Sequence, residues 1–498
     1  MYRKQEVGIM LQPEFNAVTG VKKVSAEVKK SVEVSSLLTE EIKKPVSVSA
    51  EAYIISREKG ENETAATAKA VFHFVYLAEE GYKKAEMSAE VNAKIPLGNA
   101  YVTAHIEDPR IISVSEGYVA KANVIFKGEA EKAESKNALV GGDGVFIKEF
   151  TEEYDAYTGV SEGTTNLEDE FEVDYAVSEV LTHVESVNLN EVKSGISSVI
   201  FDGEATIELC LLPLTENGDI MRERRKIPFR YEMENVGALP DMRAYGNAEI
   251  KRVAVKVTAD EAKGKSNIIT EMVLGFSGEA VESVAVTLAE DAYSKTNTVN
   301  IRKEKTERVK YIGQFVFSEK IVTLAEGEIP DGGRYITVLG ENLTVISTET
   351  HGGKIKATGS VGADVVFKNS DNGVTVVSAE APFDVETDVV GDAETVRVSL
   401  SDFSAKVKNG SVEFEFTVRV IYRLYDKKEF DVISEIVEGE ERPISKSTIT
   451  IYIPSEGDGI WEIAKQLGES EEDVRKYNPD LVFPLSEKDR IVIYRQKI

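Results

Sequence analysis

Cysteine is almost absent from this chain of 498 residues, since Cys210 is its only thiol. An intrachain disulfide is therefore impossible, which suits a protein that folds in a reducing compartment. Cys210 lies in the apolar run 207–212 with no histidine near it in sequence. We interpret it as a buried structural thiol rather than a nucleophile.

Long apolar runs and an excess of positive charge are also lacking. No stretch is long and apolar enough to span a bilayer, and residues 1–8 lead into no signal-peptide core. The chain is therefore expected to work in the cytoplasm, where it is made. Its formal net charge is −28, from 59 Lys and Arg against 87 Asp and Glu, which makes nucleic acid and anionic membrane surfaces poor partners.

Motifs for catalysis or for a cofactor are missing as well. The four histidines are scattered singly and form no metal-binding spacing, and His73 is interpreted as a solvated strand residue. The glycines of 141–144 and 352–353 match neither a phosphate loop nor a dinucleotide fingerprint, and no nucleophile elbow occurs. We expect no enzyme, no catalytic residue, no metal and no cofactor. A hydrolase built from residues distant in sequence stays open as an alternative.

Alternation with period two dominates most of the chain. Residues 46–53, 253–257 and 412–420 alternate apolar with polar or small side chains, as half-buried strands do. Asn-Gly pairs within 371–373 and 408–410 are typical of tight hairpin turns. Many strands with turn signals between them predict an all-β fold of sandwiches or barrels.

A weak internal repeat runs through these strands. Three triplets centred on Pro96, Pro228 and Pro382 each follow an alternating strand and a polar turn, and further strands come after them. Proline cannot donate to a sheet ladder, so each triplet is expected at a strand start or an exposed edge. The pattern predicts three tandem β-sandwich-like repeats. Their expected limits are 1–145, which includes an N-terminal extension, 146–320 and 321–440, followed by an acidic linker and a small domain at 447–498.

The last fifty residues have a different sequence pattern, with helical as well as strand signals. A strand at 448–454 precedes an apolar helical stripe over 459–467, which Gly468 ends. Ser470 begins a second helix with a capping-box-like sequence, and a final strand follows at 490–494. The predicted order is β-α-α-β.

This module resembles the LysM family. The resemblance is carried by Gly-Asp-Gly-Ile-Trp-Glu-Ile-Ala at 457–464, by Tyr-Asn-Pro at 477–479 and by the closing strand 491–493. Family members bind glycans that contain N-acetylglucosamine between a loop before the first helix and a loop after the second. Gly459 stands where the family usually has Thr or Ser. Carried over, the candidate residues for binding a glycan or a partner are Asp458, Gly459, Ile460, Asn478, Pro479, Asp480 and Leu481.

The apolar residues of that motif have a plainer interpretation. Trp461, Ile463 and Ala464 are expected to pack in the core of the module rather than to stack on a ligand. Asn478 and Pro479 can equally be a helix stop followed by a turn.

The whole chain is similar to the spore-envelope assembly proteins of spore-forming bacteria, of which the clostridial SipL type is closest in layout. The features are the three acidic β repeats, the segment Asp291-Ala-Tyr-Ser294 after the second repeat, and the terminal LysM-like module. The resemblance implies a non-enzymatic scaffold made in the mother cell and recruited to the forespore surface and spore coat. It also implies a coat morphogenetic partner, an ATPase of the SpoIVA type. The alternative is a protein that binds peptidoglycan through N-acetylglucosamine.

Overall fold

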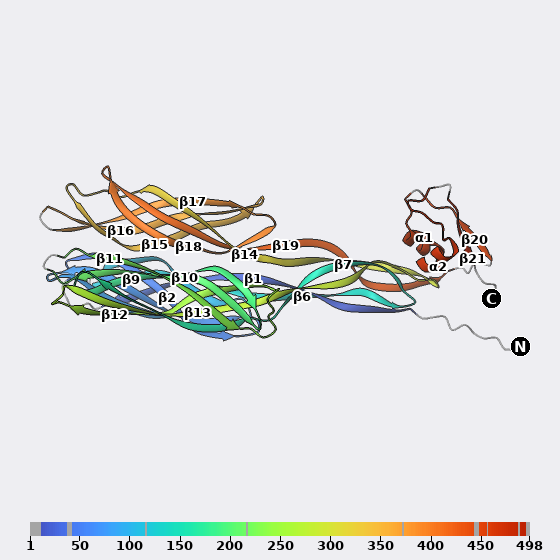
Figure 1. The fold of residues 1–498 in the computed structure, drawn as a ribbon, viewed down its shortest axis with the longest axis horizontal. Helices are drawn as coiled ribbons and strands as arrows, with labels where there is room; N and C mark the ends of the chain where they lie inside the picture. The colour runs from blue at the N-terminus through green and yellow to red at the C-terminus, as the bar shows by residue number, and fades with distance from the viewer. Residues whose placement is uncertain are drawn as a thin grey trace.

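The computed structural model describes residues 11–36, 42–114, 117–215, 218–370, 373–442, 448–455, 457–486 and 489–494. Most of these residues lie in antiparallel strands, which confirms the predicted mainly β class. The molecule is elongated: a wide body of bundled sheets narrows into a stalk, and a small module with two helices lies at the far end (Figure 1).

Three consecutive sets of strands build the body and the stalk. Repeat 1 consists of β1 (Gln12–Ser36), β2 (Lys44–Lys59), β3 (Thr64–Ala78), β4 (Gly81–Ile95), β5 (Tyr101–Val114) and β6 (Gly117–Asp143). Repeat 2 consists of β7 (Phe146–Tyr157), β8 (Ser161–Val173), β9 (Val177–Gly195), β10 (Ser198–Pro213), β11 (Met221–Glu234), β12 (Arg243–Asp260) and β13 (Lys265–Tyr293). Repeat 3 consists of β14 (Asn297–Ala325), β15 (Arg334–His351), β16 (Lys354–Lys368), β17 (Val374–Asp388), β18 (Asp392–Lys408) and β19 (Ser411–Glu441).

The three sets share one topology. In repeat 1 the sheets have the orders β1-β6-β5 and β2-β3-β4, and repeat 3 reproduces them as β14-β19-β18 and β15-β16-β17. Repeat 2 differs in one place, because β7 and β8 pair in succession with β13 where the other repeats have one long strand. The weak sequence repeat therefore corresponds to a real structural repeat.

The proline triplets lie at the edges of these sheets, as expected. Pro228 is in β11 and Pro382 is in β17, and both strands are outermost in their three-stranded sheets. Pro96 directly follows β4, the corresponding edge strand. An edge strand tolerates proline, which lacks an N–H, because one of its two sides forms no hydrogen bonds with a neighbouring strand.

The limits of repeat 3 differ from the sequence-based ones. The limit expected between 320 and 321 falls inside β14, which pairs with β19 from Asn297 to Ala325. Repeat 3 therefore begins at 297, and the glycines at 331–333 only mark the turn between β14 and β15. The expected linker at 435–443 overlaps the end of β19, whose residues 435–441 pair with the start of β14, and Pro443 lies outside the described residues. Charged side chains misled the interpretation here, because both faces of this ribbon are rich in them.

Each repeat has an apolar core between its two sheets. Phe72 and Phe126 are fully buried in repeat 1, as are Phe201 in repeat 2 and Phe414 and Phe416 in repeat 3. Burying such a side chain stabilises the fold by about 1.5–3 kcal/mol. The three cores are separate clusters, so each sandwich is stabilised by the burial of its own apolar side chains.

A further apolar cluster joins all three repeats. Its buried members are Val46, Val75, Tyr82, Leu181, Cys210, Ile220, Leu339 and Val366. Cys210 is buried there, as the sequence predicted, and burial raises the pKa of its thiol well above the ordinary value. The body is thus one bundle of three sandwiches rather than beads on a string.

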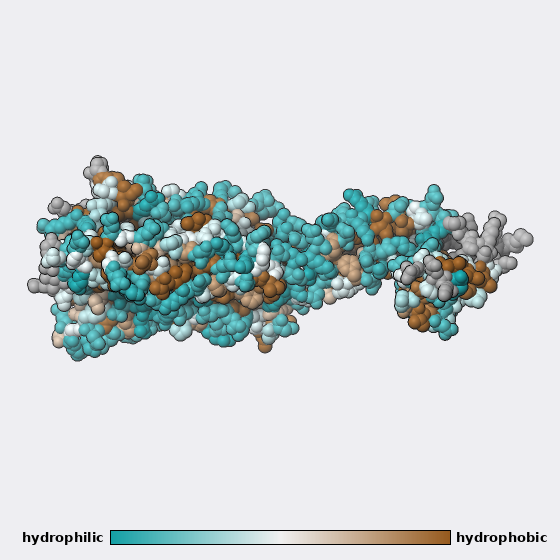
Figure 2. Space-filling model, turned by 90° about the horizontal axis from the view of Figure 1, so that it is seen from above, coloured by the Kyte–Doolittle hydropathy of each residue, from teal (hydrophilic) through white to brown (hydrophobic). Residues whose placement is uncertain are grey.

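The stalk is built from three twisted ribbons, one from each repeat. The ribbons pair 12–23 with 131–143, 146–157 with 281–293, and 297–311 with 425–441. Their inward side chains form a narrow apolar seam. The buried members are Val18, Ala138, Leu139, Tyr154, Leu288, Ala289, Ala292, Val432 and Ile433. The outer surface of the stalk is largely hydrophilic with a few apolar patches (Figure 2).

The C-terminal module (residues 448–494) has the predicted β-α-α-β order. It consists of β20 (Ile449–Tyr452), α1 (Ile460–Leu467), α2 (Glu471–Tyr477) and β21 (Ile491–Tyr494), with β20 and β21 antiparallel. Gly468 ends α1 with φ 66°, a left-handed conformation that glycine adopts readily. Ser470 caps α2 by accepting a hydrogen bond from the Asp473 N–H. Within the described residues, neither helix is long and apolar enough to cross a membrane.

Candidate functional site

The candidate residues of the C-terminal module lie on two loops, one before α1 and one after α2. Ile460 and Leu481 are half-buried and pack against one apolar core, whose buried members include Trp461, Ile463 and Ala464. The prediction that these three pack in the core is confirmed.

Asp458 is engaged in the turn that leads into α1. Its Oδ2 accepts hydrogen bonds from the Ser455 N–H at 2.8 Å and from the Tyr452 hydroxyl at 3.0 Å. Gly459 follows as the N-cap of α1, and its N–H donates to the Glu462 carboxylate at 3.1 Å. The first loop is therefore held by its own carboxylates.

Asn478 is engaged just as fully. Its Nδ2 donates to the carbonyls of Val474 at 2.9 Å and Val492 at 2.8 Å, and its Oδ1 accepts from the Val492 N–H at 2.7 Å. The side chain thus fastens the end of α2 to β21. Pro479 and Asp480 are exposed beside it, and Leu481 is half-buried.

One carboxylate of the stalk makes three of the contacts that hold this module. Asp291 of β13 accepts from Trp461 Nε1 at 2.8 Å and from Lys465 Nζ at 2.6 Å and 2.8 Å. Burial raises the pKa of Asp291, but these hydrogen bonds outweigh burial and leave it below its ordinary value. The indole N–H of Trp461, the only tryptophan of the chain, therefore points toward the stalk.

Tyr293 completes the attachment two residues further on. It is fully buried, its ring meets Trp461 edge-on with centroids 4.9 Å apart, and its hydroxyl donates to the Glu469 carbonyl. Lys295 also pairs with Asp473 at 2.9 Å. The segment 291–294 thus attaches the module to the stalk, a role that no local pattern in its sequence indicates.

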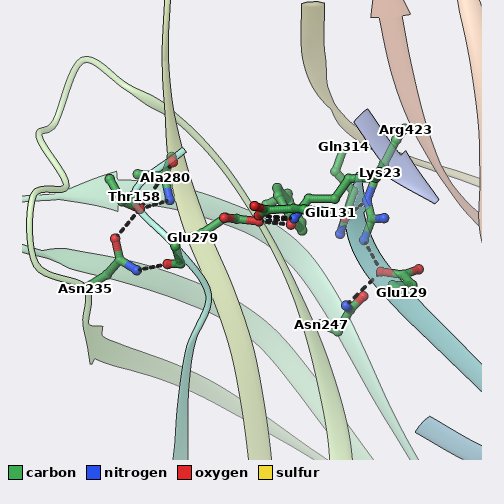
Figure 3. Close-up of polar contacts among 12 residues, drawn as sticks. Lys23, Glu129, Glu131, Thr158, Asn235, Asn247, Glu279, Ala280, Gln314 and Arg423 are labelled. Carbon is green, nitrogen blue, oxygen red and sulfur yellow. Dashed lines mark hydrogen bonds and ion pairs between the residues drawn. The ribbon is translucent and has the colours of Figure 1, made fainter. Parts of the chain in front are cut away.

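A buried polar layer crosses the molecule where the stalk meets the body (Figure 3). Arg423 of β19 donates to Glu129 of β6 at 3.0 Å and stacks over the Tyr245 ring. Lys23 of β1 pairs with Glu131 at 2.7 Å and also with Glu279 of β13. All three repeats supply charged or titratable side chains to this layer, so its contacts tie the repeats to one another.

Two histidines also come together, contrary to the sequence-based interpretation. His73 of β3 and His183 of β9 lie with ring centroids 4.9 Å apart, at the contact between repeats 1 and 2. Only 12% of the His73 side chain is exposed, so the prediction of a solvated strand residue is wrong. No local spacing could reveal this pair, because the two histidines lie 110 positions apart in the sequence, on strands of different repeats.

Comparisons with family models, with curated proteins and with solved structures find no match for this chain.

Proposed function

We propose that the protein is a non-enzymatic scaffold of the spore envelope, made in the mother cell and placed at the forespore surface. In this proposal the C-terminal module is a LysM-type domain that docks on the ATPase of the coat's basement layer. The observation that carries it is the attachment of the module: Asp291 and Tyr293 hold it at the end of a long stalk, away from the body. A module held at the end of a long stalk can bind one partner while the body binds another, as a scaffold requires.

An apolar surface on the module supports docking on a protein. On the outer face of the β20–β21 pair, Ile449 lies opposite Tyr494, and Ile451 follows on the same side. Their exposed fractions are 52%, 51% and 62%, and Ile453 beside them is 57% exposed. Grouped exposed apolar side chains are typical of interaction surfaces. We call these four residues the apolar face of the module.

The glycan-binding alternative ranks second. Asp458 and Asn478, two of the three polar side chains that the family resemblance assigns to the groove, use their hydrogen-bonding atoms inside the module. Glycan recognition would then depend on the exposed loop at Pro479 and Asp480 and on backbone groups.

Titration calorimetry of the full chain with the coat ATPase tests the proposal. The double variant Ile449→Ser and Ile451→Ser is expected to weaken binding at least tenfold. Ile196→Ser is the matched control, since Ile196 is 78% exposed in the body. Equal binding by the wild type and the double variant would contradict docking through the apolar face. Fluorescent fusions that stayed diffuse during sporulation would contradict the envelope role itself.

A further inference from the structure

Five polar side chains form a cluster between repeats 1 and 2. Glu51 and Tyr53 lie two residues apart on β2, and His183 and Glu185 lie two residues apart on β9. Residues i and i+2 of a strand point to the same face, so both pairs project into the contact between the sheets. His73 of β3 is paired with Ser49 of β2 and joins from the side.

The distances in this cluster suit a metal ion. His183 Nδ1 lies 2.9 Å from Glu185 Oε2 and 3.6 Å from Glu51 Oε1, and the ligand atoms of the three residues all lie within 4.8 Å of one another. Ligands at zinc bond lengths in a tetrahedron are separated by about 3.3 Å. Small rotamer adjustments would bring the three atoms onto one ion. His73 Nε2, 3.8 Å from Glu51 Oε2, is placed to be a fourth ligand.

Two of these atoms have unused bonding capacity. Glu51 Oε1 and His73 Nε2 are buried and make no hydrogen bond to any described residue. A bound cation would satisfy both orphaned atoms and both carboxylates at once.

The hydroxyl of Tyr53 gives the cluster a supporting contact. It donates to Glu185 Oε1 at 2.7 Å and also contacts Glu51. Metal-binding carboxylates are commonly oriented by such outer hydrogen bonds. Imidazole with carboxylate suits zinc and its neighbours in the transition series, whereas calcium and magnesium prefer oxygen ligands alone.

We propose that Glu51, His183 and Glu185, with His73 beside them, bind one divalent transition-metal ion of the zinc class that clamps repeat 1 to repeat 2. The ion has a structural role here, because all its ligands come from strands buried between two sandwiches. The site is independent of the proposed docking role of the C-terminal module, which lies at the other end of the molecule (Figure 1).

Metal titration of the chelator-treated full chain tests this site. With magnesium in excess, Zn²⁺ is expected to bind at one equivalent in calorimetry and to raise the thermal midpoint. Co²⁺ is expected to give the visible absorption of a low-coordinate site. Absence of saturable Zn²⁺ binding by the folded protein would overturn the proposal.

Variants separate this site from adventitious binding on an acidic surface. Glu51→Gln and His183→Gln are each expected to weaken Zn²⁺ at least tenfold and to abolish the thermal shift, while circular dichroism verifies folding. His73→Gln, at the edge of the cluster, provides a second test if either variant fails to fold. His105→Gln is the matched control, since the His105 side chain is 54% exposed and lies beside Glu107. Equal affinity in all the variants would assign the binding to the surface and overturn the proposal.

Discussion

Arg423 of repeat 3 and Glu129 of repeat 1 occupy the same position of their repeats, yet they carry opposite charges and bind each other. Each lies nine residues before a buried pair of the stalk seam, Val432-Ile433 and Ala138-Leu139. Glu279 holds that position in repeat 2, nine residues before Leu288. Three identical charges here would repel one another, whereas Arg423 and Glu129 attract each other across the contact between repeats 3 and 1.

Replacing Arg423 by Met is expected to destabilise the bundle strongly. Glu129 would be left buried without its ion-pair partner, which typically costs about 3–5 kcal/mol. The additional change Glu129→Gln should recover much of the loss, because the uncompensated charge disappears. Denaturant unfolding followed by circular dichroism measures both effects. Arg302→Met, on the exposed stalk surface, is the control, and equal losses for Arg302 and Arg423 would contradict a special role of the layer.

Stability is expected to fall as the pH rises through the neutral range. Burial raises the pKa of Glu279 to about 8, with Lys23 opposing and Glu131 adding to the shift. The ordinary value is 4.5, so the stabilising contribution of the protonated carboxyl is fully present below pH 4.5 and is lost as the pH rises through about 8. Thermal midpoints between pH 6 and pH 9 should therefore decline in the wild type.

Glu279→Gln should flatten that decline, because glutamine resembles the protonated carboxyl. Above pH 8 the variant should be more stable than the wild type. Glu271→Gln, on the exposed face of the same strand, should leave the profile unchanged. Parallel pH profiles for the wild type and Glu279→Gln would show that another group controls the dependence.

Local sequence patterns predicted the elements of this fold well. Alternation marked the strands, the proline triplets marked sheet edges, and the helix signals around Gly468 and Ser470 predicted the C-terminal module. These signals are local, because the period of a strand and the cap of a helix depend on neighbouring residues.

Association between the repeats could not be predicted in the same way. His73 and His183, or Arg423 and Glu129, meet only after strands from different repeats are packed, and a single sequence carries no sign of that packing. The start of repeat 3 was misplaced for a related reason. The first half of β14 is highly charged on both faces in the stalk, so it lacks the alternation that revealed the strands of the body.

Asp291→Ala is expected to loosen the C-terminal module without unfolding the body. It removes three hydrogen bonds to Trp461 and Lys465, each worth about 1–3 kcal/mol when a charged group is involved. Trp461 is the only tryptophan, so a red shift of the emission and easier quenching would report the release directly. Glu290→Ala, the neighbouring exposed residue, is the control. An unchanged spectrum in Asp291→Ala would mean that Tyr293 and Lys295 suffice to hold the module.

Asn478→Ala and Asp480→Ala should separate folding of the module from recognition by its second loop. Loss of the Asn478 side chain leaves the carbonyls of Val474 and Val492 and the Val492 N–H without their partner. The module should therefore lose about 2–4 kcal/mol of stability, and the Trp461 fluorescence should change. Asp480 is exposed, and its replacement should leave that fluorescence unchanged. Sedimentation with purified sacculi then becomes interpretable. Binding that Asn478→Ala abolishes but Asp480→Ala preserves would reflect only unfolding of the module. Loss of binding in the folded Asp480→Ala variant would instead assign glycan recognition to this loop and raise that alternative above docking on a protein.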